Sequence, residues 1–254
     1  MIKYLAMRAQ EKEWYRDWFN SPYYHLLYEE RDINEAAAFI NRLVDHLNPK
    51  QVSYMLDIAC GKGRHSFQLA GKGFQVTGID ISPKSILEAQ MTGNDNPEFF
   101  IHDMRLPFRI NYYDYAFNFF TSFGYFDTRR EHYNAIRNMT SSIKHGGCFV
   151  IDYLNPEYIL QNLEPRSEIK KGDILFSVER YADTEYFFKK ITVKDPSLKE
   201  PLLFMEKVAR FNLDQFTEMF KVNGLTIHEV MGDYFLHQYQ ASSSPRMIMI
   251  AKKE

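Results

Sequence analysis

The chain has 254 residues, of which 45% are hydrophobic and 25% charged, so it can bury a large core and is neither disordered nor fibrous. Its net charge of -2 disfavours nucleic acid as a partner, because nothing attracts the whole chain to a phosphate backbone. Only two cysteines occur, Cys60 and Cys148, and they form no CxxC pair, so neither a disulfide framework nor a metal site is expected.

The N-terminal residues 1–48 are expected to form a helical cap segment with mixed polar and apolar positions. One helix is predicted over residues 35–47. Asp32 and Asn34 both precede this helix, and the side-chain oxygen of either residue could cap its first turn.

From residue 49 onward, continuous apolar runs, in which polar residues do not alternate, are followed in turn by segments with helical periodicity. Such runs are typical of strands that are covered on both faces of a sheet. The predicted strands cover residues 52–59, 74–80, 98–103, 113–122 and 148–154. The predicted helices between them cover residues 65–73, 85–91 and 129–144. This alternation indicates a parallel, doubly wound α/β sheet.

Residues 161–210 have a different residue pattern, in which aromatic and β-branched residues partly alternate with polar ones. The segments 174–182, 185–195 and 203–211 predict an antiparallel β insert after the fifth strand. Ligands of open α/β sheets bind beyond the carboxyl ends of the strands, so we expect this insert to be a substrate lid rather than a dimer contact.

A predicted helix over residues 213–222 and predicted strands over 225–234 and 246–253 follow the insert. The core domain is therefore expected to comprise residues 49–160 and 211–254.

Two glycines follow the first predicted strand, in the segment MLDIACGKGRHS. A turn from a strand into a helix needs glycine where φ is positive or where a ligand touches the backbone, and Gly61 and Gly63 suit both roles. Ser66 replaces the third glycine of the dinucleotide-binding pattern, so the loop alone is weak evidence.

Acids at the ends of the next strands add specificity. Asp80 lies 17 residues beyond Gly63, where its carboxylate can accept hydrogen bonds from both hydroxyls of a ribose. His102 and Asp103 end the third strand and place another acid where an adenine amino group could donate to it. The pattern therefore indicates a nucleoside ligand.

Five segments between residues 50 and 156 resemble, in the expected order, the motifs of the class I S-adenosylmethionine-dependent methyltransferases. They are LDIACGKGRH, GIDIS, IHDM, YDYAFNFFTSFGYF and IKHGGCFVIDYLN. The resemblance implies a Rossmann-like seven-stranded methyltransferase sheet, S-adenosyl-L-methionine as cofactor and S-adenosyl-L-homocysteine as product. An NAD-binding Rossmann domain is the rival interpretation, although a carboxylate at position 57 would repel the diphosphate of NAD.

The resemblance also implies roles for the matching residues. Asp57 would orient the ammonium of the methionine part, directly or through water, and the main-chain carbonyl of Phe119 would face the same group. Asp80 would bind the ribose, and Asp103 with the backbone of Met104 would bind the adenine. The complete cofactor set expected from these motifs is Asp57, Ala59, Gly61, Gly63, Asp80, Ile81, His102, Asp103, Met104 and Phe119.

The segment SPYYHLLYEERD resembles the tyrosine-rich lead segment of small-molecule N-methyltransferases, including those that act on sugar amines. This similarity implies that Tyr24 or Tyr28 covers the sulfonium and that Arg31 pairs with the methionine carboxylate.

The expected reaction is in-line methyl transfer to a nitrogen or oxygen atom of a small molecule, with positioning as its main source of rate. Tyr125, Tyr153 and His237 are candidate acceptor contacts, chosen because they follow strands or lie in the last connection. Enzymes that methylate nucleobase amines carry an NPPY-type tetrapeptide where this chain has FNFF. This difference disfavours base methylation on DNA.

Two other functions stay open at this point. The chain could bind the cofactor without catalysis, as a regulatory subunit, or it could methylate tRNA or protein. The sequence offers no signal-peptide pattern and no apolar run of membrane-spanning length, so a cytoplasmic protein without membrane contact, as a monomer or homodimer, is expected.

Overall fold

The computed structural model describes residues 13–29, 33–93 and 95–254, which form two compact units. The larger unit comprises residues 33–123, 128–159 and 211–254. The smaller unit comprises residues 13–29, 124–127 and 160–210.

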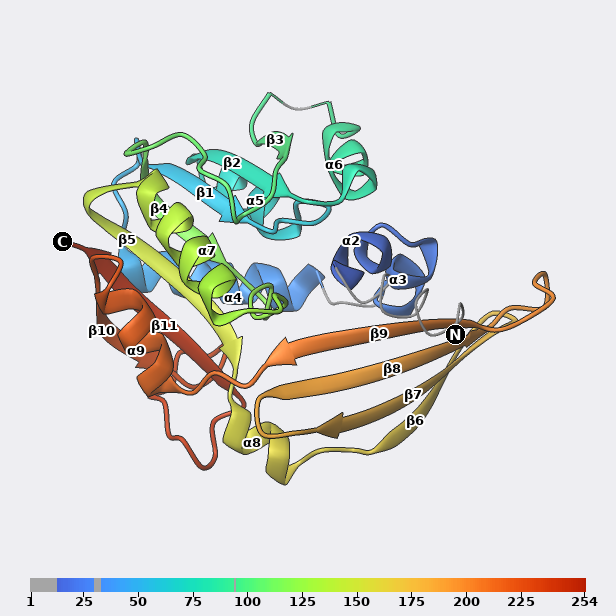
Figure 1. Ribbon diagram of the computed structural model, residues 1–254. Helices are drawn as coiled ribbons and strands as arrows, with labels where there is room; N and C mark the ends of the chain where they lie inside the picture. Colours follow the sequence, from blue (N-terminus) through green and yellow to red (C-terminus); the bar gives the residue numbers. More distant parts are fainter. Residues whose placement is uncertain (1–12, 30–32, 94) are drawn as a thin grey trace. The chain divides into compact units, whose positions relative to one another are not determined.

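A seven-stranded sheet forms the centre of the larger unit (Figure 1). Its strand order is β10-β11-β5-β4-β1-β2-β3, and all neighbours run parallel except β11, which is antiparallel to both β5 and β10. This topology confirms the predicted Rossmann-like seven-stranded sheet. The strands are β1 (Tyr54–Ile58), β2 (Gln75–Asp80), β3 (Glu98–Ile101), β4 (Tyr113–Asn118), β5 (Ile143–Leu154), β10 (Leu225–Met231) and β11 (Arg246–Lys253).

Helices cover both faces of this sheet. Helices α4 and α5 pack together on one face, and α7 and α9 pack together on the other (Figure 1). The helices from residue 33 onward are α4 (Ile33–Leu47), α5 (Arg64–Gly71), α6 (Pro83–Gln90), α7 (Arg129–Ser142), α8 (Pro156–Gln161) and α9 (Leu213–Lys221).

Side-chain caps fix where several of these helices begin. Ser82 accepts a hydrogen bond from the Ser85 amide at 3.2 Å and precedes Pro83, as expected for a helix start. Asn212 caps α9 in the same way by accepting from the Gln215 amide at 2.9 Å. Of the two predicted caps of α4, Asp32 lies outside the described residues, and Asn34 lies inside the helix, which begins at Ile33.

The hydrophobic core of the larger unit lies between the sheet and α4 and α5. The apolar runs of the central strands supply one side of it. Because α7 and α9 cover the opposite face of the sheet, these strands are buried on both faces and show no polar alternation. Its buried residues include Phe39, Ile40, Leu43, Met55, Leu69, Val76, Phe117, Val150, Ile248 and Ile250.

Strand β5 begins earlier than the sequence predicts. The predicted helix extends to residue 144, but α7 ends at Ser142 and β5 starts at Ile143. Tyr113 pairs with Ile143 while Tyr115 pairs with Cys148, so the strand contains a bulge between these two pairs. Gly146, with φ of 74°, permits this irregular path, and the glycine pair therefore lies inside the strand rather than closing the helix.

The smaller unit contains an antiparallel sheet with the order β6-β7-β8-β9, which confirms the predicted β insert after the fifth strand. Trp18 packs on Phe204 at 4.6 Å, and Tyr23 lies 6.5 Å from Phe176 between ring centroids. The elements are α2 (Trp14–Phe19), α3 (Pro22–Leu27), β6 (Arg166–Lys171), β7 (Ile174–Ala182), β8 (Tyr186–Lys194) and β9 (Leu202–Ala209).

Cys60 and Cys148 are both buried and free. Within the described ranges, no helix combines the length and the apolar character needed to cross a membrane.

Candidate functional site

The loop between β1 and α5 turns through three residues in the left-handed region of φ. Ala59, Gly61 and Gly63 have φ values of 60°, 57° and 80°. The Cys60 amide donates to the Ile79 carbonyl at 3.0 Å, and the Gly63 amide donates to the Cys60 carbonyl at 3.0 Å. The predicted glycines therefore stand where φ is positive, whereas Ala59 adopts the same conformation despite its side chain.

Gly63 differs from Gly61 in the space around it. A β-carbon at Gly63 would lie 2.5 Å from Cζ of Phe99, and one at Gly78 would lie 2.6 Å from Cδ1 of the same ring. The corresponding position at Gly61 has no atom within 4 Å. Position 63 therefore requires glycine for two reasons, and position 61 for its φ alone.

Asp57 lies near the end of β1 with 1% of its surface exposed. The Ser66 hydroxyl donates to its Oδ2 at 2.6 Å. Burial raises the pKa of Asp57 to about 7; the charge of Asp80 acts in the same direction, while the Ser66 hydrogen bond and the charge of Arg64 oppose it. Ser66, which replaces the third glycine of the pattern, is thus a partner that sequence reasoning missed.

Asp80 ends β2 and connects two loops. Its Oδ2 accepts from the Gly61 amide at 2.8 Å, and its Oδ1 accepts from the Ser82 amide at 2.8 Å. Burial raises the pKa of this carboxyl, although the same backbone hydrogen bonds work against the rise. The carboxylate therefore lies beside both the glycine loop and the start of α6.

The residues after β3 are joined to the same edge. The His102 amide donates to the Asp80 carbonyl at 2.8 Å. Asp103 accepts from Arg105 with both oxygens, the shortest contact being 2.7 Å, and Arg105 also lies 3.3 Å from Glu131. Sequence analysis missed Arg105. Its local signal is its position two residues after Asp103, a base following an acid.

Phe119 directly follows β4 and is 3% exposed. Its ring lies 4.7 Å from the His65 ring and 5.6 Å from the Phe39 ring, between centroids. The side chain is therefore a packing element, which leaves the main chain at this position as the group available to a ligand.

The structure brings most of the motif residues to one edge of the sheet. Strands β3, β2, β1 and β4 are adjacent and parallel, so the residues at their carboxyl ends share that edge. The other expected cofactor residues lie in the loops after these strands and are half-buried: Ala59, Ile81, His102 and Met104.

The tyrosines of the smaller unit form an aromatic cluster. Phe19 lies 5.0 Å from Tyr24 and 5.3 Å from Tyr125, and Tyr24 lies 5.0 Å from Tyr28, between ring centroids. The structure thus brings Tyr125 close to two tyrosines of the N-terminal segment, Tyr24 and Tyr28. Arg31, which was expected to act with them, lies outside the described residues.

A charged pair engages the hydroxyl of Tyr28. This hydroxyl donates to Oε1 of Glu206 at 2.8 Å, and Trp18 donates to the same oxygen at 2.7 Å. The Lys189 ammonium donates to the Tyr28 hydroxyl and lies 4.5 Å from the centre of its ring. Lys189 and Glu206 come from β8 and β9, and no sequence signal links them to Tyr28.

The two other candidate acceptor contacts occupy opposite environments. Tyr153 is fully buried and packs edge-on against Phe216 at 4.9 Å. The His237 side chain is 76% exposed, and its Nδ1 lies 2.7 Å from Oδ2 of Asp233. The hydrogen bonds to Asp233 outweigh its burial and lower the pKa of its carboxyl, so this acid stays ionised beside the imidazole.

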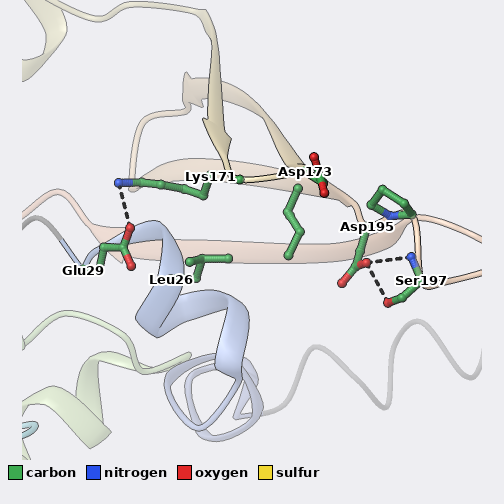
Figure 2. Close-up of a pocket in the computed structure, with 9 residues that line it drawn as sticks. Leu26, Glu29, Lys171, Asp173, Asp195 and Ser197 are labelled. Atoms are coloured by element: carbon green, nitrogen blue, oxygen red, sulfur yellow. Dashed lines mark hydrogen bonds and ion pairs between the residues drawn. The ribbon is translucent and has the colours of Figure 1, made fainter.

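A pocket in the smaller unit contains none of the residues expected to bind cofactor or acceptor (Figure 2). It encloses about 520 Å³. Lys171 and Glu29 form an ion pair of 3.2 Å there, and Asp195 accepts from the Ser197 amide at 2.8 Å. The lining residues are Leu26, Glu29, Lys171, Gly172, Asp173, Ile174, Asp195, Pro196 and Ser197.

In the part of the chain that the structure describes, no three His, Cys, Asp or Glu side chains are grouped as metal ligands would be.

Residues 55–147 match the family model described as a methyltransferase domain. Among curated relatives, the tRNA U34 carboxymethyltransferase of Hahella chejuensis is 28% identical over 119 residues. The matched segment is 44% of this chain and 36% of that protein. The family match covers the glycine loop and the ends of β1 to β4.

Solved structures share the fold over nearly the whole chain. An S-adenosylmethionine-dependent methyltransferase from Clostridium acetobutylicum has a TM-score of 0.76 at 17% identity, covering 91% of this chain and 96% of that chain. CalS10 from Micromonospora echinaspora, an amino pentose methyltransferase solved with S-adenosylmethionine bound, has a TM-score of 0.64 at 16% identity. That match covers 100% of this chain and 97% of CalS10.

The contrast between the two glycines generates a first prediction. Gly61→Ala should lower the free energy of unfolding by about 1–2 kcal/mol, the cost of a left-handed alanine. Gly63→Ala should cost about 1–3 kcal/mol more, because its β-carbon also overlaps the packed Phe99 ring. Urea unfolding of both variants measures this difference, and equal losses would contradict it.

The pKa of Asp57 generates a second prediction. Between about pH 4 and pH 7 the folded protein holds a proton on this residue that the unfolded chain has released, so this proton's contribution to stability falls as the pH rises. Asp57→Asn cannot titrate and should therefore gain stability relative to the wild type between pH 5 and pH 7.5. Urea unfolding of both proteins at each pH measures the change, and an unchanged difference would refute it.

Proposed function

We propose that the chain is a class I S-adenosylmethionine-dependent methyltransferase, which transfers a methyl group to a nitrogen or oxygen atom of a small molecule; the methyltransferase-domain match and the shared fold support this. The cofactor is S-adenosyl-L-methionine, and demethylation converts it to S-adenosyl-L-homocysteine. We further propose the cytoplasm as the site of this reaction.

One observation carries the assignment of the cofactor site. Two buried carboxylates, Asp57 and Asp80, lie at the ends of adjacent strands next to a glycine loop with positive φ. A carboxylate attracts an ammonium and accepts hydrogen bonds from ribose hydroxyls, whereas it would repel a diphosphate. This arrangement supports an adenosyl amino acid over a nicotinamide dinucleotide.

We assign the two ends of the cofactor to different strands. Asp57 would hold the ammonium with the Phe119 carbonyl, and Gly61 and Gly63 would let the methionine part approach the backbone. Asp80 would accept from the ribose hydroxyls with lone pairs that the backbone amides leave free. Residues at the ends of β2 and β3 would surround the adenine, and these are Ile81, His102, Asp103 and Met104.

When bound, the cofactor supplies a methyl group on a sulfonium, which is already a good leaving group. The protein therefore has to align the acceptor and exclude water, and such positioning can supply about 7–11 kcal/mol. A general base typically contributes only about 100- to 10,000-fold, so its absence would not prevent the reaction. The acceptor's own lone pair forms the new bond, and its proton leaves to water or to a nearby base.

The aromatic cluster of the smaller unit has the chemistry for a role at the transferred methyl. Aromatic faces attract a cation through their quadrupole, so Tyr24 and Tyr28 would suit a sulfonium. Tyr125, Tyr153 and His237 stay the proposed acceptor contacts. We favour His237, since its side chain is exposed and a carboxylate orients its Nδ1. The insert, residues 161–210, would act as the lid.

A tRNA methyltransferase is the second candidate, and one observation favours it. The similarity to the Hahella chejuensis enzyme includes sequence identity of 28%, which exceeds that of the solved small-molecule enzyme CalS10 at 16%. We favour the small molecule because CalS10 matches the whole chain, including the insert, whereas the tRNA enzyme matches 44% of it.

The decisive experiment measures cofactor binding before the acceptor is known. Titration calorimetry should detect binding of S-adenosyl-L-homocysteine to the wild type. Asp80→Asn should weaken it about 10- to 100-fold, because a ribose hydroxyl loses a charged acceptor. Asp114→Asn makes the same change at a carboxylate that pairs with Lys144 at 2.8 Å at the opposite end of β4, and should leave binding unchanged.

Transfer of a labelled methyl group to a panel of amines, alcohols and bulk tRNA then separates the functions. Labelling of a small amine or alcohol supports the first proposal, and labelling of tRNA alone supports the second. Wild-type protein that binds NADH but not S-adenosyl-L-homocysteine would refute both.

A further inference from the structure

The chain leaves β4 through two consecutive left-handed residues, neither of which is glycine. Phe120 and Thr121 have φ values of 62° and 56°. This conformation is unfavourable for residues with a β-carbon, and Thr121 is also β-branched. The turn therefore persists only because surrounding groups hold it, and strain of this kind is common at functional sites.

Asp152, on the adjacent strand β5, supplies the groups that hold this turn. Its Oδ2 accepts from the Phe120 amide at 2.8 Å, and its main-chain carbonyl accepts from the Thr121 amide at 2.9 Å. Asp152 is fully buried, so both hydrogen bonds form away from water. One residue thus binds both amides of the left-handed pair.

Two further side chains fix the Asp152 carboxylate in this position. Arg246, from β11, donates to its Oδ1 at 2.7 Å and to the Thr121 hydroxyl at 2.8 Å. Tyr234, in the connection between β10 and β11, donates to its Oδ2 at 3.0 Å. The carboxylate is therefore neutralised and oriented by partners from two distant segments.

The hydrogen bond from the Phe120 amide to Asp152 also fixes the direction of the Phe119 carbonyl. The bond between Phe119 and Phe120 is not among the cis peptide bonds of the described chain, so its C=O and N–H point in opposite directions within one plane. With the N–H held by Asp152, the Phe119 carbonyl must point away from Asp152. Rotation of this peptide plane would require the loss of that hydrogen bond.

Stability alone gives little reason for this arrangement. A buried ion pair can often be replaced by apolar side chains of similar volume without loss of stability, since burying both charges is costly. The neighbouring residues of β5, such as Val150 and Ile151, are apolar and fully buried. An acid at position 152 therefore calls for a role that an apolar residue could not perform.

We propose that Asp152 is a positioning residue, which with Arg246 and Tyr234 holds the Phe119–Phe120 peptide so that the Phe119 carbonyl faces the ammonium of the cofactor. This inference rests on the proposed function, which puts that ammonium beside Phe119. It adds a set of three side chains that do not touch the cofactor themselves.

The test compares two ligands that differ at the relevant group. S-Adenosyl-L-homocysteine carries the amino acid part, whereas 5′-methylthioadenosine contains the same nucleoside without it. Asp152→Asn has only one acceptor oxygen and cannot serve both Arg246 and the Phe120 amide. It should weaken binding of S-adenosyl-L-homocysteine about 10-fold and leave binding of 5′-methylthioadenosine within about 2-fold, by calorimetry.

Two further variants complete the experiment. Asp114→Asn should leave both affinities unchanged. Tyr234→Phe removes a single hydrogen bond to Asp152 and keeps its ion pair, so it should show the same selective loss at smaller size, even where Asp152→Asn does not fold. Circular dichroism tests whether each variant is folded.

Each outcome has a distinct meaning. A selective loss for S-adenosyl-L-homocysteine supports the inference. Equal losses for both ligands, or no loss for either, would overturn it and leave the proposed function standing. Wild-type protein that binds neither ligand would instead overturn the proposed function, and the inference with it.

Discussion

The edge of the sheet at the carboxyl ends of β1, β2 and β4 depends on buried carboxylates that accept hydrogen bonds from backbone amides. Removing a carboxylate from water is costly unless hydrogen bonds compensate for the lost solvation. Asp80 meets this requirement with the amides of Gly61 and Ser82, and Asp152 with that of Phe120. The same contacts fix the loops after β1, β2 and β4. A single physical requirement thus orders both the acids and the backbone around them.

Asp57 differs from these two acids in a way that bears on chemistry. Its hydrogen-bond donors are the hydroxyl and the backbone amide of one residue, Ser66, and burial raises its pKa to about 7. The carboxyl that we place beside a cationic group is therefore buried with a charge that its hydrogen bonds compensate only in part. A bound ammonium would supply what the protein leaves out, because an opposite charge favours the ionised form.

The sequence predicts the elements whose signals are local. Apolar runs located β1, β2 and β4, and a serine followed by a proline located the start of α6, because burial on two faces and helix capping act on neighbouring residues. Strand β6 was missed because its sequence, RSEIKK, contains one apolar residue and relies on pairing with β7. The early start of β5 was missed because the bulge at Gly146 depends on partners in β4 and β11.

The same distinction applies to the candidate site. Gly61, Gly63 and Asp80 could be located because each lies within a few residues of a predicted strand end. Contacts such as Tyr28 with Glu206 could not be found, since 178 residues separate the two and neither has a distinctive local pattern. A buried acid in a strand, such as Asp152, gives a signal in principle, but its partner Arg246 lies 94 residues away.

That separation also affects how the protein is made. Strand β11 lies between β5 and β10, so the sheet stays open along β5 until the ribosome has released residues 246–253. Until then, Asp152 has no guanidinium to neutralise it, and the turn after β4 lacks the hydrogen bond from Arg246 to the Thr121 hydroxyl. The nascent chain can therefore assemble β1 to β4 early, while the edge that we propose binds the cofactor is completed only when this segment has been synthesised.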